Sequence, residues 1–73
     1  MQSTTKVTLI SCRGVTECTV RLIGGAEVEA VLDVDALRAR HGAVYDVRVG
    51  DTVEVVEDKP LRIVAVEKHN GGG

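Results

Sequence analysis

The chain has almost no aromatic side chains, since it contains one Tyr and neither Phe nor Trp. Proteins that bind single-stranded nucleic acid commonly stack its bases on aromatic rings, and this route is largely closed here. Basic residues are not in excess either, because nine Lys and Arg stand against eleven Asp and Glu, a formal net charge of −2. The sequence therefore excludes a protein that coats nucleic acid through charge alone.

Long apolar runs are also missing. The longest are only a few residues, whereas about 20 are needed to span a bilayer. The first six residues, Met1 to Lys6, lack the apolar core of a secretory signal. We therefore expect a cytoplasmic protein with no membrane partner.

The two cysteines, Cys12 and Cys18, do not have the spacing of a redox or zinc motif, and His41 and His69 lie far from them in sequence. A strand–turn–strand arrangement would bring the two thiols close enough to oxidise. In a reducing cytoplasm, small and partly buried thiols are the simpler interpretation. No acid–base pair and no nucleophile with a His partner is evident. We expect no enzymatic activity, no cofactor and no bound metal.

What the chain has in abundance is β-branched residues: 14 Val, three Ile and six Thr among 73. These residues lose side-chain freedom in helices and fit the pleated surface of a sheet. A chain of this length has room for one small domain. We expect a single all-β domain over residues 6–67, between a disordered N-terminus at 1–5 and a disordered Gly-rich tail at 68–73.

Alternating apolar and polar residues predict five strands. We expect them over residues 6–12, 17–23, 26–32, 52–57 and 61–67. Gly24-Gly25 predicts a tight hairpin between the second and third strands. In the last strand, the alternation places Leu61, Ile63 and Ala65 inward and Val66 outward.

A short helix is expected between the third and fourth strands. Asp33 or Asp35 would cap its start, and His41-Gly42 would end it. About two turns are too few to be stable alone, so the helix must pack on the sheet, through Leu37. Three strands, a helix and two strands are typical of a small five-stranded OB-like barrel, whose closure removes exposed sheet edges.

Four segments between about residues 14 and 66 resemble the S1-type OB folds, most closely the bacterial translation initiation factor one family. They are Cys18-Thr-Val-Arg-Leu22 with Gly25-Ala-Glu-Val28, Ala36-Leu-Arg38, Val49-Gly-Asp-Thr-Val-Glu-Val55 and Arg62-Ile-Val64. The resemblance implies a non-enzymatic protein that binds RNA or the ribosome, through the small ribosomal subunit or single-stranded RNA. The chain differs from the family in its negative charge and in Cys18, where the family has an aromatic residue.

Six residues are candidates for a nucleic-acid-binding face, because arginine presents planar donors to phosphate oxygens and a tyrosine ring can stack on a base. On an OB barrel, the arginines of the second strand and the helix would border one groove. In the alternative interpretation the arginines are scattered solubilising charges and the tyrosine lies at the rim of the core. The candidates are Arg21, Arg38, Arg40, Tyr45, Arg48 and Arg62.

Three other interpretations remain open. The acidic balance and scarce aromatics suit a protein-interaction module, such as a phage or accessory factor that docks on a larger protein. A core this small would also be helped by homo-oligomerisation. The end of the sequence, Gly71-Gly72-Gly73, resembles the conjugated tail of ubiquitin-like proteins and sulfur carriers, although those predict a long central helix.

Overall fold

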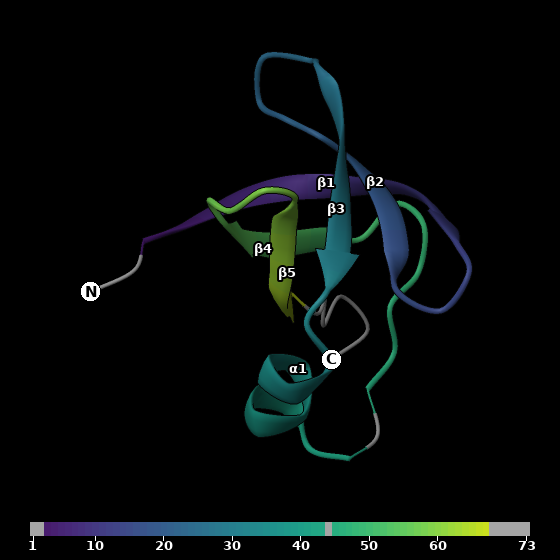
Figure 1. Cartoon of the computed structure of the whole chain (residues 1–73), viewed down its shortest axis with the longest axis vertical. Coiled ribbons are helices and arrows are strands. Elements are labelled where there is room, and N and C mark those ends of the chain that lie inside the picture. The colour runs from purple at the N-terminus through teal and green to yellow at the C-terminus, as the bar shows by residue number, and fades with distance from the viewer. Residues whose placement is uncertain (1–2, 44, 68–73) are drawn as a thin grey trace, which may run out of the picture.

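Five strands and one helix follow one another along the chain (Figure 1). The computed structural model describes residues 3–43 and 45–67. The elements are β1 (Thr4–Arg13), β2 (Glu17–Arg21), β3 (Glu27–Leu32), α1 (Val34–His41), β4 (Thr52–Val56) and β5 (Leu61–Glu67). The prediction of a mostly β protein with five strands and one short helix is confirmed. The predicted Gly-rich tail at 68–73 lies outside the described residues.

The strands form one sheet that closes on itself in the order β1-β2-β3-β5-β4. Every strand therefore has two neighbours. The pairings are antiparallel except between β3 and β5, which run parallel with Leu32 opposite Ile63. A parallel pair needs a long connection, and α1 lies within it. In Figure 1, α1 lies below the sheet while the β2–β3 hairpin projects at the top.

Aliphatic side chains fill the inside of this ring. The largest fully buried ones are Leu9, Val20, Leu37, Val53 and Ile63. Leu37 comes from α1 and is 0% exposed, which confirms that the helix packs on the sheet through this residue. Burying one such side chain contributes about 1.5–3 kcal/mol, so the helix is held mainly by its contact with the strands.

The ends of α1 follow from its sequence. Asp33 has an extended backbone, and its carboxylate Oδ1 accepts a hydrogen bond from the Ala36 N–H at 3.1 Å. Of Asp33 and Asp35, the two residues predicted to cap the helix, Asp33 is therefore the N-cap. Gly42 ends the helix with φ of 90°, and its N–H donates to the Arg38 carbonyl. That φ is accessible to glycine without strain.

Two strand boundaries differ by two residues from the sequence-based expectation, and the other strand boundaries agree with it to within one residue. β1 begins at Thr4 rather than at residue 6, because Thr4 and Thr5 pair with Val56 and Val55 of β4. β2 ends at Arg21, so Ile23 lies on the hairpin rather than in the strand and is 87% exposed.

Val66 corrects the inward–outward pattern predicted for the last strand. It is 4% exposed, although the alternation placed it outward. A bulge in β5 turns it inward. Ile63 stands opposite Val55 and Val66 stands opposite Val53, which leaves Val64 as an extra residue. Val66 thus joins the core cluster, and its N–H donates to Nε2 of His41 at 3.0 Å, where α1 packs against β5. A bulge shifts the period-two alternation by one residue, and the sequence pattern alone does not mark where this happens.

Candidate functional site

The six candidate residues do not gather at one place. Arg21 lies at the end of β2, where it pairs with Glu27 at 3.0 Å. The helix that carries Arg38 and Arg40 follows the other end of β3. Because β3 spans six residues, about 17 Å of strand separates these ends at ~3.3 Å per residue. The expected groove bordered by Arg21, Arg38 and Arg40 is therefore not formed.

Arg62 lies between two carboxylates. Its guanidinium is 3.6 Å from Asp33 and 3.4 Å from Asp58. Asp33 thus caps α1 with one oxygen and faces Arg62 with the other, which ties β5 to the start of the helix. Arg62 is half-buried, and its Nε is buried without a hydrogen-bond partner among the described residues. This arginine is placed for structural contacts within the chain.

Arg48 is also neutralised locally. Its Nε donates to Asp46 at 2.8 Å, while its backbone N–H donates to the carboxylate of Asp51 at 2.9 Å. These two contacts hold the turn before β4. The side chain is exposed, but the nearby acid cancels its charge.

Arg38 and Arg40 remain the most available of the basic candidates. Arg40 is 61% exposed and lies 4.0 Å from Glu54, the longest ion pair of the described residues. Arg38 is exposed and has no ion pair within residues 3–43 and 45–67. Two positions along a helix correspond to a rotation of about 200°, so the two side chains leave α1 on different sides. They flank the helix and do not form one patch.

Tyr45 packs against the core. It is half-buried and contacts the aliphatic cluster together with Val47. The structure therefore favours the interpretation of Tyr45 as a residue at the rim of the core. His41 is likewise engaged, since its Nε2 accepts the backbone N–H of Val66 at 3.0 Å. His41 therefore acts here as a docking residue between α1 and β5.

The outer face of β2 and β3 carries mixed charge. Arg21 and Glu27 are paired in register, and Thr19 stands opposite Glu29. Glu17 at the start of β2 is a further exposed acid. Three glutamates and one arginine give this face a net negative charge, which does not attract the phosphates of a nucleic acid.

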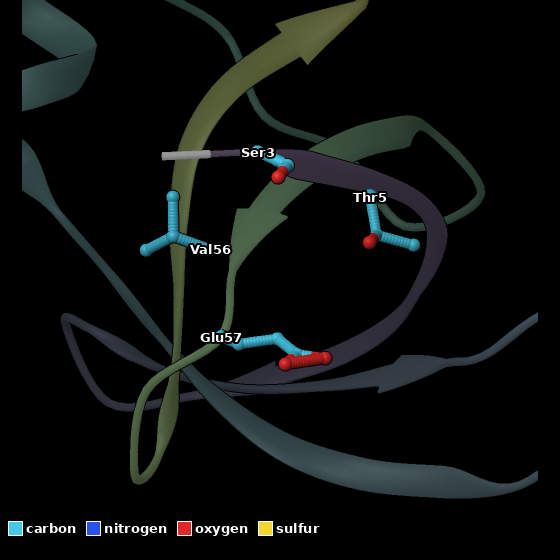
Figure 2. Close-up of a pocket in the computed structure, with 4 residues that line it drawn as sticks. All are labelled: Ser3, Thr5, Val56 and Glu57. Atoms are coloured by element: carbon cyan, nitrogen blue, oxygen red, sulfur yellow. The ribbon is translucent and has the colours of Figure 1, made fainter. Parts of the chain in front are cut away.

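A group of hollows lies at the end of the ring opposite α1, and no sequence pattern predicted it. One, of about 310 Å³, lies between Ser3 and Thr5 at the start of β1 and Val56 and Glu57 at the end of β4, as Figure 2 shows. Two more adjoin the β2–β3 hairpin and the β4–β5 turn, and Glu57 lines all three.

The hollow beside the hairpin, which we call the open-end hollow, is also about 310 Å³ in volume. It is lined by Thr5, Leu22, Ile23, Gly24, Val55, Glu57 and Leu61. Most of these side chains are apolar, and Ile23 stands out from the tip of the hairpin. Glu57 has no ion pair within the described residues. One signal in the sequence was available: Ile23 directly precedes two hairpin glycines, where no core position is expected.

The two cysteines lie opposite each other. Cys12 of β1 pairs in register with Cys18 of β2. Cys12 is exposed and Cys18 is buried, and both are free thiols. Burial raises the pKa of the Cys18 thiol to about 12, and the neighbouring Cys12 adds to the shift. Cys18 thus stays protonated at neutral pH.

Within residues 3–43 and 45–67, no three His, Cys, Asp or Glu side chains are grouped so that they could hold a metal ion. Nor does this part of the chain contain a helix with the length and apolarity needed to cross a membrane. No protein-family model, curated protein or solved structure matches the chain.

Proposed function

We propose that the protein is a non-enzymatic binding module with an OB-type barrel, acting on RNA or on the ribosome. The observation that carries the proposal is the strand order β1-β2-β3-β5-β4, with a helix between β3 and β4. This order supports an OB-type arrangement, a fold that binds oligonucleotides in many proteins. The local motifs that resemble the initiation factor one family support the same proposal.

The contacts within the chain narrow the proposed RNA-binding residues to two. Arg21, Arg48 and Arg62 each have a carboxylate within 3.6 Å. Such partners compete with phosphate, because an arginine fork already engaged by a carboxylate has fewer free donors. Arg38 and Arg40, on either side of α1, keep more of their guanidinium donors available to phosphate. We therefore assign the RNA contact to the surface around α1.

The test is binding of a labelled single-stranded RNA, and of purified small ribosomal subunits, over a range of salt concentrations. Replacing both Arg38 and Arg40 by Glu should weaken binding. It should also lower the slope of log K against log salt by about 0.7 for each RNA phosphate that is no longer neutralised. The double variant Arg21→Glu with Arg48→Glu is the matched control, since it makes the same charge change at two arginines that already pair with a carboxylate. Absence of binding to both probes at low salt would refute the proposal.

A second candidate function is supported by the charge pattern and the open-end hollow. The arginines alternate with acids over the surface, and at the edge of the apolar hollow lies Glu57, which has no ion pair in the described part of the chain. Apolar lining beside such an acid is complementary to a peptide that presents an aliphatic side chain next to Lys or Arg. The candidate is therefore a protein-interaction module whose ligand is such a basic-aliphatic segment.

A peptide titration followed by backbone amide NMR separates the two candidates. We expect a Lys-Leu-Lys-Leu-Lys peptide to shift the amides of residues 22–24, 57–59 and 61, and a Glu-Leu-Glu-Leu-Glu peptide to leave them unchanged. Ile23→Ser and Glu57→Gln should each weaken this binding, whereas Arg38→Glu should not. If the same amides shift on concentrating the protein alone, the occupant is a second copy of the chain and the peptide proposal is wrong.

A further inference from the structure

We propose that Cys12 and Cys18 form a thiol–disulfide exchange site, which reacts with a small-molecule disulfide such as oxidised glutathione and closes into a disulfide between β1 and β2. The inference is independent of the RNA or peptide partner. It rests on the register of two strands, on the bulge in β1 that sets this register and on the unequal exposure of the two thiols.

The register brings the two residues within bonding range. Cys12 is opposite Cys18, flanked by the pairs Ser11–Thr19 and Arg13–Glu17. Directly opposite residues of an antiparallel pair have Cα atoms about 4.5 or 5.5 Å apart, depending on the hydrogen-bonding position. A disulfide needs about 4.4–6.8 Å between Cα atoms. Either position satisfies this range, so the spacing of the two strands is compatible with the bond.

A bulge in β1 creates this register. The pairing runs from Leu9 opposite Val20 to Ser11 opposite Thr19, which leaves Ile10 as an extra residue. Without the extra residue, Ser11 would stand opposite Cys18 and Cys12 would be displaced toward the turn. A single irregularity in the ladder therefore determines which side chain faces the buried thiol.

The unequal exposure gives the two thiols different roles. Exposed Cys12 is accessible to the oxidant, and its thiolate attacks one sulfur of the glutathione disulfide, which forms a mixed disulfide and releases one glutathione thiolate. Buried Cys18 then attacks the Cys12 sulfur, loses its proton to solvent and expels the second glutathione. One disulfide is reduced to two thiols while the protein dithiol is oxidised to one disulfide. The raised pKa of Cys18 agrees with this order, since a buried thiol does not begin the reaction.

The experiment treats the folded protein with oxidised glutathione and follows intact mass and free thiols. We expect the wild-type protein to lose both free thiols and the mass of two hydrogens, with no glutathione attached. The Cys18→Ser variant should keep one glutathione on Cys12, and the Cys12→Ser variant should keep the free thiol of Cys18. Circular dichroism should remain that of the folded protein after oxidation.

A displaced cysteine provides the matched control. In the double variant Ser11→Cys with Cys12→Ser, the exposed thiol moves by one residue, out of register with Cys18. The loop that the disulfide would close differs by one residue in length, so the entropy cost of closing it is nearly the same as in wild type. We expect this variant to accumulate the mixed disulfide. The proposal is overturned if the variant closes its disulfide as readily as wild type, if wild type keeps a mixed disulfide, or if oxidation unfolds the protein.

Discussion

The two ends of the strand ring are finished in different ways. At one end α1 closes the ring: Leu37 fills its opening, His41 accepts a hydrogen bond from Val66, and Asp33 caps the helix while facing Arg62. At the other end the β2–β3 hairpin and the β4–β5 turn leave the open-end hollow, and Ile23 stands exposed.

We therefore expect the closed end to contribute mainly to stability and the open end mainly to association. Residues at the closed end contact one another, so each change there weakens the packing of the folded chain. Residues at the open end present exposed apolar area beside an acidic side chain, so changes there should alter association while the free energy of unfolding stays nearly constant. Four substitutions test this division, in order of decreasing effect on stability.

The largest effect is expected for Leu37→Ala. Truncating a fully buried leucine leaves a cavity at the closed end and should lower the free energy of unfolding by about 2–5 kcal/mol. Urea denaturation followed by circular dichroism measures it. Leu37→Met, which nearly conserves volume, should reduce stability by less than about 1.5 kcal/mol. Equal reductions for the two variants would show that Leu37 does not fill the opening.

Replacing His41 by Leu should have the next largest effect. The Val66 N–H then has no acceptor while remaining under the helix, which destabilises the fold by about 1–3 kcal/mol. His41→Gln provides a side-chain carbonyl as a substitute acceptor and should recover part of the stability. Thermal or urea unfolding of both variants provides the measurement, and a fully stable His41→Leu protein would contradict the docking role.

Asp33→Ala should destabilise the protein by about 0.5–2 kcal/mol, through loss of the helix cap. Asp33→Asn retains a capping oxygen but removes the charge that faces Arg62, so it separates the two roles of this carboxylate. We expect Asn to recover most of the stability at high salt, where the ion pair is screened. If Asn is as damaging as Ala, the interaction with Arg62 dominates.

The smallest effect on stability is expected at the open end. Ile23→Ser removes an 87% exposed side chain and should change the free energy of unfolding by no more than about 0.5 kcal/mol. The same variant should weaken binding of the basic-aliphatic peptide. A large drop in stability here would remove the distinction between the two ends.

Sequence periodicity predicted the strands, the short helix and the packing of Leu37, because each follows from neighbours along the chain. It did not predict the burial of Val66, which depends on a bulge at Val64. The opposition of Cys12 and Cys18 depends on a bulge at Ile10 that no local pattern marks. The pairing of Arg40 with Glu54 was also out of reach, because Glu54 comes from a distant segment. The pairing of Arg48 with Asp46, two residues away, is of the kind that the sequence does suggest.

The closure of the ring through β1 and β4 has a consequence for how the molecule folds. This seam joins Thr4 to Val56 and Thr8 to Thr52, so nearly the whole chain must be ordered before the seam offsets the entropy of bringing these segments together. Contacts so distant in sequence slow folding. We therefore expect the seam to form last and to open first, so that its amide hydrogens exchange with solvent before those of the β2–β3 hairpin. Transient opening would expose two unpaired strand edges at once, and the same event would determine both the folding rate and the tendency to aggregate.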